Sequence, residues 1–204
     1  SANNTAQYNP LQGLSPLENP TGRLVFTGAS ASPGIAAAPV FVFKEEELQL
    51  EQNATDLEQE LDALDQALKI AHEQLDQLYA DMLKKSPSEA EIFKAHQQLI
   101  VDNSIIHTAK DIIKDGHKAA WSWDRALKDQ IAALEVIDDE RIKARTADMR
   151  DVAVRVARIL TNTTDFSFPQ GEDFVLLATE LTPSQTAYLS NVQIKGIVTE
   201  LGGP

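Results

Sequence analysis

An unbroken heptad pattern constrains this chain more than any other feature of its sequence. Between residues 55 and 82, apolar residues recur at alternating intervals of four and three positions. These residues are Leu57, Leu61, Leu64, Leu68, Ala71, Leu75, Leu78 and Met82. Because such a repeat places every apolar side chain on one helical face, it predicts a long amphipathic helix. Thr55 and Glu58 have the spacing of a capping box and are expected to begin it.

Four further segments have helical patterns and clear start or stop signals. The second helix is expected to begin at Ser86 and Pro87, a capping residue followed by a proline that suits the first turn. The third should end near Gly116, the fourth contains both tryptophans, and the fifth should end before Asn162. Five helices with short connections predict a bundle whose apolar stripes face inward.

Patterns typical of β-strands lie on both sides of this bundle. Leu24–Phe26 and Val40–Phe43 flank a segment rich in Gly, Ser and Pro, and we interpret them as neighbouring strands. Phe174–Ala178 has the continuous apolar character of a buried strand, and Ile194–Val198 is another candidate. Between them, Thr182 and Pro183 are expected to cap and open a short helix.

The order of strands, helices and strands predicts an α+β, multidomain chain in which a helical bundle is inserted into an α/β domain. The expected parts are a linker or leader at 1–22, a discontinuous α/β domain at 23–44 and 166–204, and the inserted helical domain at 45–165. The first part is irregular and contains three prolines, which favours a linker.

Charge and composition exclude several classes of function. The chain has 31 acidic and 18 basic residues, so nucleic acid is not expected as a partner. The bundle segment 45–165 holds 26 of the acids and 15 of the bases, which suits either a solvated surface or a basic protein partner. The absence of cysteine fits a reducing compartment, and no apolar run approaches the ~20 residues of a membrane span.

The residues alone indicate no catalytic centre. The four histidines all lie in the bundle without the spacing of a metal site, so no metal is expected. They are His72, His96, His107 and His117. The acidic run Asp138–Glu140 precedes a helix, where the helix dipole favours negative charge.

Several motifs, in this order, resemble the N-terminal half of enzyme I of the bacterial phosphoenolpyruvate-dependent sugar phosphotransferase system. They are Gly28–Ala36, Ile92–His96, Asp138–Glu140 with Arg145–Asp151, Leu181–Ala187 and Gly196–Gly203. The resemblance covers about residues 24–204. It implies a swivelling phosphohistidine α/β domain whose inserted bundle docks the small phosphocarrier HPr. It also implies a cytoplasmic protein that transfers phosphate from phosphoenolpyruvate, through a histidine, to HPr during sugar uptake.

The resemblance has one departure at its C-terminal end. In the family, a Thr-Ser-His motif follows the loop that corresponds to Gly202 and Gly203, and its histidine carries the phosphoryl group. The sequence stops at Pro204, so the phosphohistidine is expected just after this residue, and the 204-residue chain is expected to be inactive and without a cofactor. The full-length parent is expected to be a phosphoenolpyruvate-protein phosphotransferase that uses Mg²⁺.

The Pro- and Asn-rich leader favours a multiphosphoryl transfer fusion protein over a stand-alone enzyme I. The enzyme-I-like module of a dihydroxyacetone kinase phosphotransfer subunit is an alternative. A rival from another class is a non-enzymatic helical scaffold that binds a basic partner. Because the family dimerises through a barrel outside this sequence, we expect a monomer.

The resemblance also implies roles for particular residues. Thr186 corresponds to a threonine that supports the phosphohistidine, although its hydroxyl could instead be satisfied within its own helix. The expected contacts with HPr, or with a fused HPr-like module, have an apolar centre with two acids beside it and one arginine at the rim. In that order they are Phe93, His96, Leu99 and Ile100, then Glu89 and Glu91, then Arg145. For the apolar members, the alternative is a place in the bundle core.

Overall fold

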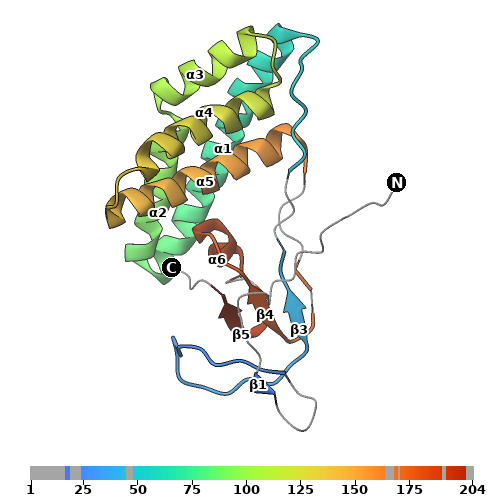
Figure 1. Cartoon of the computed structure of the whole chain (residues 1–204), viewed down its shortest axis with the longest axis vertical. Coiled ribbons are helices and arrows are strands. Elements are labelled where there is room, and N and C mark those ends of the chain that lie inside the picture. Colours follow the sequence, from blue (N-terminus) through green and yellow to red (C-terminus); the bar gives the residue numbers. More distant parts are fainter. Residues whose placement is uncertain are drawn as a thin grey trace. The chain divides into compact units, whose positions relative to one another are not determined.

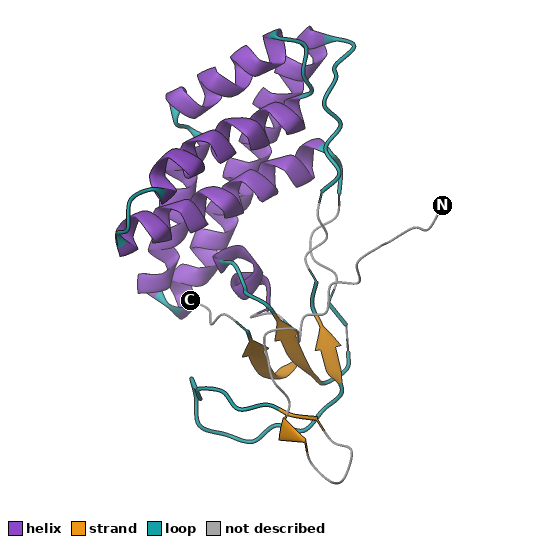
Figure 2. Cartoon of the chain, viewed as in Figure 1, coloured by secondary structure: helices purple, strands orange, loops and turns teal. Residues whose placement is uncertain are grey.

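The computed structural model describes residues 17–18, 24–44, 48–163, 168–169, 171–189 and 192–200 (Figure 1). The chain divides into two compact units, which separate most of the helices from the strands (Figure 2). The helical unit consists of residues 46–167 and 182–187, and the α/β unit of residues 1–45, 168–181 and 188–204. We expected residues 182–187 in the α/β domain, but side-chain bonds to the fifth helix place them in the helical unit.

Five helices between residues 57 and 160 build the helical unit, as the sequence predicts. They are α1 (Leu57–Lys85), α2 (Pro87–Ile100), α3 (Asn103–Lys114), α4 (Ala119–Glu135) and α5 (Glu140–Leu160). A short helix, α6 (Pro183–Leu189), begins in the same unit. In the described part of the chain, no helix is both long enough and apolar enough to cross a membrane.

The starts of the first two helices differ in detail from the predicted caps. The predicted Thr55 capping box is wrong by one position, because Asp56 is the N-cap of α1 and accepts a hydrogen bond from the Gln59 amide at 3.1 Å. A carboxylate is the stronger acceptor at the positive end of a helix. Ser86 is the N-cap of α2 and Pro87 its first residue, as predicted, but the Ser86 side chain makes no capping hydrogen bond.

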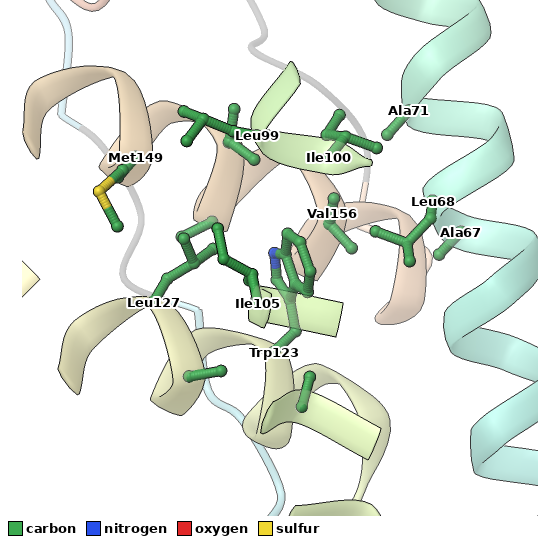
Figure 3. Packing of buried hydrophobic residues seen from close by; sticks show 14 of the residues in the cluster. Ala67, Leu68, Ala71, Leu99, Ile100, Ile105, Trp123, Leu127, Met149 and Val156 are labelled. Atoms are coloured by element: carbon green, nitrogen blue, oxygen red, sulfur yellow. The ribbon is translucent and has the colours of Figure 1, made fainter. Parts of the chain in front are cut away.

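The core of the helical unit closes around a tryptophan. The heptad residues Leu64 and Leu75 of α1 are fully buried, and so is Trp123 of α4. Figure 3 shows Trp123 among core residues of the other helices, including Ile105 of α3 and Val156 of α5. Full burial of one large apolar side chain contributes roughly 1.5–3 kcal/mol. Packing of the apolar stripes therefore stabilises the bundle and determines which face of each helix remains exposed to solvent.

The α/β unit contains a parallel sheet with strand order β3-β4-β5. The strands are β3 (Val40–Val42), β4 (Phe174–Ala178) and β5 (Ile194–Thr199). Phe174, Leu176 and Ala178 of the central strand are buried, whereas Val40 and Val198 of the outer strands are exposed. Both outer strands thus have apolar side chains in solvent.

A separate two-stranded ribbon corrects two sequence predictions. β1 (Leu17–Glu18) pairs antiparallel with β2 (Leu24–Val25), so part of the expected linker forms a strand. β2 and β3 are not neighbours, since β3 pairs with β4. Two-residue strands have no periodicity that a sequence can reveal, and the long apolar run of β4 is the better partner for β3.

Candidate docking surface and buried polar cluster

Helix α2 places four of the predicted partner-binding residues in the core of the helical unit. Phe93, His96, Leu99 and Ile100 are at most 5% exposed. They occupy the face of α2 that closes the bundle, because residues three, four and seven positions apart share one side of a helix. The expected exposed apolar centre is therefore absent at these four positions, and the bundle-core alternative describes them.

The charged candidates lie at the surface. Glu89, Glu91 and Arg145 are all exposed. Glu91 accepts a hydrogen bond from Lys94 at 2.8 Å, and the Lys94 ammonium lies 4.7 Å from the centre of the Tyr79 ring. The hydrogen bond with Glu91, followed by the one with Tyr79, raises the pKa of Lys94 to about 12. The surface of α2 thus carries the Lys94 ammonium, which stays positively charged at neutral pH and is partly balanced by the Glu91 carboxylate.

A shallow groove of about 570 Å³ lies where α1 meets the turn between α2 and α3. Its apolar lining includes the buried Ile100, Val101, which is 55% exposed, and the half-buried Ile106. The remaining lining residues are Asp65, Leu68, Lys69, His72, Glu73 and Asn103. Lys110 of α3 donates to Asp65 at 2.8 Å and joins α3 to α1 beside the groove. We call this site the α1–α3 groove. Its lining combines apolar side chains with the acidic side chains of Asp65 and Glu73.

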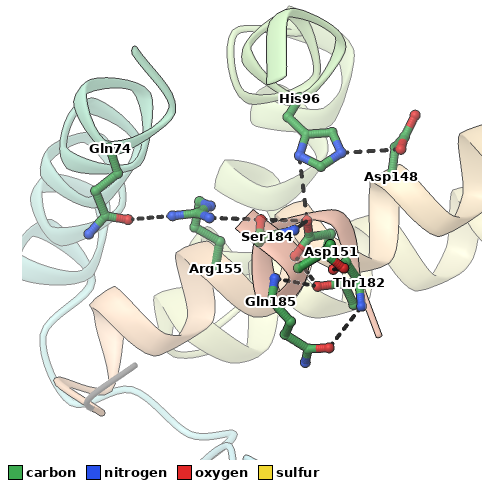
Figure 4. Close-up of polar contacts among 9 residues, drawn as sticks. Gln74, His96, Asp148, Asp151, Arg155, Thr182, Ser184 and Gln185 are labelled. Carbon is green, nitrogen blue, oxygen red and sulfur yellow. Dashed lines mark hydrogen bonds and ion pairs between the residues drawn. The ribbon is translucent and has the colours of Figure 1, made fainter. Parts of the chain in front are cut away.

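A cluster of polar side chains, of which His96, Asp151 and Ser184 are buried, connects α2 with α5 and α6 (Figure 4). His96 Nε2 lies 3.1 Å from Asp148 Oδ1, and His96 Nδ1 lies 3.6 Å from Asp151 Oδ2. Both aspartates come from α5, three residues apart on one face. The imidazole is fully buried, so these two carboxylates define its polar surroundings.

Asp151 joins α5 to the start of α6. Its Oδ2 accepts hydrogen bonds from the Ser184 hydroxyl at 2.6 Å and from the Ser184 amide at 3.3 Å. Its Oδ1 accepts from the Thr182 hydroxyl at 3.3 Å. Asp151 is only 4% exposed, and a carboxylate this deeply buried requires such donors.

Arg155 extends the cluster by one helical turn. One nitrogen of its guanidinium donates to the Ser184 hydroxyl at 2.8 Å, and the other donates to Gln74 of α1 at 2.8 Å. Ser184 therefore donates to Asp151 and accepts from Arg155. We call the residues that these contacts join the buried polar cluster. They are Gln74, His96, Asp148, Asp151, Arg155, Thr182 and Ser184.

The local structure of α6 follows the sequence signal. The Thr182 amide donates to Gln185 Oε1 at 2.8 Å, and the Gln185 amide donates to Thr182 Oγ1 at 3.3 Å. This reciprocal capping box confirms Thr182 as the cap, with Pro183 as the first helical residue. The half-buried Thr186 donates its hydroxyl to the Thr182 carbonyl at 3.0 Å. Its hydroxyl is thus satisfied within its own helix, and its role at a phosphohistidine stays a prediction.

The sequence predictions did not include the two aspartates or the arginine of α5 among the site residues. Asp148, Asp151 and Arg155 follow one another at intervals of three and four, beside the apolar stripe that contains Val152 and Val156. This polar stripe next to a buried face was the available signal. Within the described ranges, no group of three or more His, Asp or Glu side chains is arranged to hold a metal ion.

Comparison with known proteins identifies what this architecture is similar to. The family described as "PEP-utilising enzyme, N-terminal" matches residues 27–145, more than half of the chain. The multiphosphoryl transfer protein of Rhodobacter capsulatus is 37% identical over 180 residues, which are 87% of this chain and 22% of that protein. The phosphoenolpyruvate-protein phosphotransferase of Bacillus subtilis is 32% identical over 181 residues, 86% of this chain and 32% of that protein.

A solved structure extends the likeness to three dimensions. The solution structure of the enzyme I protein called nEIt superimposes with a TM-score of 0.67 at 28% identity, over 86% of this chain and 73% of that one. This likeness confirms the predicted α/β fold with its helical bundle. The chain spans about a third or less of the length of the curated relatives named above. The match of the family to most of the bundle, with these relatives, shows that the chain belongs to the PEP-utilising enzymes and contains their N-terminal domain.

Proposed function

We propose that this chain is the HPr-docking, N-terminal part of a cytoplasmic phosphoenolpyruvate-protein phosphotransferase. The observation that carries the proposal is its similarity, over 86–87% of its length, to both a phosphoenolpyruvate-protein phosphotransferase and a multiphosphoryl transfer protein. The second relative is consistent with a parent that is fused to other phosphotransfer modules. This common similarity favours a phosphotransferase over a non-enzymatic scaffold.

In the proposed reaction, the phosphoryl group leaves phosphoenolpyruvate for a histidine and then passes to a histidine of HPr. The resemblance places the first histidine just after Pro204, with Thr186 in a supporting role. Such transfers require little covalent chemistry from the surrounding protein, because positioning and charge stabilisation supply most of the rate acceleration. The Mg²⁺ expected for the parent would act at the phosphoenolpyruvate step, and no residue of this chain is assigned to it.

The docking surface that we propose combines the α1–α3 groove with the exposed charged residues of α2 and α5. Val101 and Ile106 supply apolar contact, while Glu89 and Glu91 supply negative charge toward a basic carrier face. Arg145, which is exposed, is proposed for the rim. Phe93, His96 and Leu99 support this surface from beneath, since all three are buried. Ile100 supports it too and is the one buried candidate that also lines the groove.

Titration of ¹⁵N-labelled HPr with the unlabelled chain tests the proposal. We expect chemical-shift changes around the carrier's active-site histidine and an affinity that falls as ionic strength rises. Opposite charges mainly accelerate encounter, and salt screens them over about 10 Å at 0.1 M. The salt effect should therefore appear chiefly in the association rate.

A basic protein of similar size, such as lysozyme, is the matched control for charge alone. We expect HPr to bind at least tenfold more tightly than this control at the same salt concentration. Equal binding of the two proteins would favour the scaffold that binds any basic partner. The absence of any shift change in HPr at millimolar chain would defeat the docking proposal.

A further inference from the structure

Helix α6 is too short to hold its position by itself. It has seven residues, and isolated helices shorter than about 12–15 residues are marginal in water. Its first part nevertheless belongs to the helical unit, and Ala187 is a member of that unit's core. Contacts from the other helices must therefore fix this segment, which includes Thr186.

Asp151 supplies the most concentrated set of these contacts. Its two oxygens accept three hydrogen bonds from Thr182 and Ser184, at the start of α6. A negative charge at this end of a helix is also favoured by the helix dipole. The reciprocal capping box between Thr182 and Gln185 caps the N-terminus of α6, but its two hydrogen bonds lie within the first turn and do not connect α6 to another helix. Asp151 joins that start to α5 through three hydrogen bonds, and Arg155 of α5 adds one to the Ser184 hydroxyl.

The same carboxylate faces α2 through His96. The ring of His96 lies between Asp148 and Asp151, so a shift of Asp151 changes the surroundings of Nδ1. The main chain on either side of this histidine includes Phe93 and Leu99, which pack in the core beneath the proposed docking surface. A continuous path of buried polar contacts therefore runs from α2 through α5 to α6 (Figure 4).

We propose that Asp151 is a positioning residue that holds α6, and with it Thr186, on the helical unit, and that His96 couples this anchor to α2. The relevance of this anchor to phosphotransfer rests on the proposed function, because only that function gives Thr186 a role beside the phosphohistidine. The anchoring and the coupling are properties of the free chain. They can therefore be tested without HPr, and a failure of HPr to bind would not affect the outcome.

Amide hydrogen exchange of the 204-residue chain tests the anchor. Asp151→Asn replaces one acceptor oxygen by a donor, so α6 should open more often and the amides of Thr186 and Ala187 should exchange at least tenfold faster. Asp148→Asn is the matched control, because it makes the same change on the same helix beside the same histidine. Among the described residues Asp148 contacts His96 and makes no hydrogen bond to α6, so its variant should leave α6 exchange unchanged. Equal α6 exchange in the two variants would overturn the proposal.

The coupling to α2 has its own spectroscopic signature. Ser184→Ala removes the hydroxyl that donates to Asp151, and we expect it to shift the His96 Nδ1 resonance and the amides of α2. Ser122→Ala is the control, since Ser122 is another buried serine of the helical unit, and its hydroxyl has no partner within the described residues. An unchanged His96 resonance in Ser184→Ala, or an equal change in Ser122→Ala, would show that α6 and α2 are not coupled by this route.

Discussion

The helical unit and the α/β unit bury their apolar residues in different ways. Trp123, Leu64 and Leu127 are inaccessible to solvent, at the centre of helices that cover them on several sides. In the α/β unit, Leu176 of the central strand β4 is equally inaccessible. The outer strands differ, since Val40 is 61% and Val198 is 48% exposed. The helical unit is thus closed on its core, whereas the described sheet leaves apolar surface in solvent.

This difference indicates where the stability of the chain is concentrated. A helix makes all its backbone hydrogen bonds within one segment and needs neighbours only for its apolar face. A parallel strand needs partners from distant parts of the sequence for its hydrogen bonds as well. The helical unit should therefore fold and unfold with little dependence on the sheet.

Two identical substitutions provide the strongest test of that independence. Leu127→Ala in α4 and Leu176→Ala in β4 both remove a leucine that is 0% exposed. A cavity of this kind costs about 2–5 kcal/mol in the unit that contains it. Both tryptophans lie in α4, so urea unfolding followed by tryptophan fluorescence reports on the helical unit alone.

We expect Leu127→Ala to lower the midpoint of this transition strongly, because the free energy of unfolding should fall by the full cost of the cavity. Leu176→Ala should leave the free energy of unfolding that this transition reports within about 0.5 kcal/mol of wild type, as expected for a site outside the reporting unit. If both variants lower it equally, the two units unfold together and the contrast between them is wrong.

The comparison also explains how much of the fold could be predicted. The helices of the bundle were predictable because the heptad of α1 and the apolar stripes of the other helices are local signals. The pairing of β1 with β2 was not, because two-residue strands have no pattern. The cap of α4 illustrates another limit: Glu60 of α1 accepts from the Ala119 amide at 2.8 Å, a contact between residues far apart in the sequence.

The site was predicted less completely than the fold. Of the residues that the resemblance selected, Glu89 and Glu91 of α2 and Arg145 of α5 are exposed, and their contact with a partner stays a prediction. The resemblance could not separate the buried face from the exposed face, because Phe93 and Leu99 suit a core and a docking surface equally well. The partners of Asp151 depend on α6, which follows it by about 30 residues, and no local pattern indicates that contact.

A second test asks which of the two units docks the carrier. Val101 of the α1–α3 groove and Val40 of β3 are valines of similar exposure, 55% and 61%. Val101→Lys replaces apolar contact with a charge of the carrier's own sign, and we expect it to weaken HPr binding about tenfold, or ~1.4 kcal/mol. Val40→Lys should leave the affinity unchanged. Isothermal titration calorimetry would measure both, and a larger loss for Val40→Lys would move the site to the α/β unit.

A third test sharpens the claim that local signals stabilise the helical unit. Asp102 is the N-cap of α3, and its carboxylate accepts from the Ser104 amide at 2.8 Å. Asp102→Ala should lower the stability of this unit by about 1 kcal/mol in thermal unfolding followed by tryptophan fluorescence. Ser86→Ala removes an N-cap side chain that makes no hydrogen bond and should cost less than about 0.5 kcal/mol. A reversed order would mean that the cap geometry does not determine helix stability here.

The smallest expected effect concerns an exposed ion pair of the helical unit. Lys118 donates to Glu51, and the Lys118 amide donates to the Gln52 carbonyl at 2.8 Å, so the segment before α1 is joined to the start of α4. The hydrogen bond from Lys118, followed by its charge, holds the pKa of Glu51 below the usual 4.5. The same pairing holds the pKa of Lys118 above the usual 10.5.

These two directions define the pH range in which the pair stabilises the fold. A lowered carboxylate pKa gives stability that is present above about pH 4.5 and is lost as pH falls through the folded value. A raised ammonium pKa gives stability that is present below about pH 10.5 and is lost as pH rises through the folded value. Glu51→Gln should therefore lower the melting temperature slightly at pH 7, and the difference from wild type should shrink between pH 7 and pH 3. Asp173→Asn, which breaks the exposed Asp173–Lys195 pair of the α/β unit, should not move the tryptophan transition at either pH. A difference for Glu51→Gln that is as large at pH 3 as at pH 7 would show that the side chain acts through packing rather than through its charge.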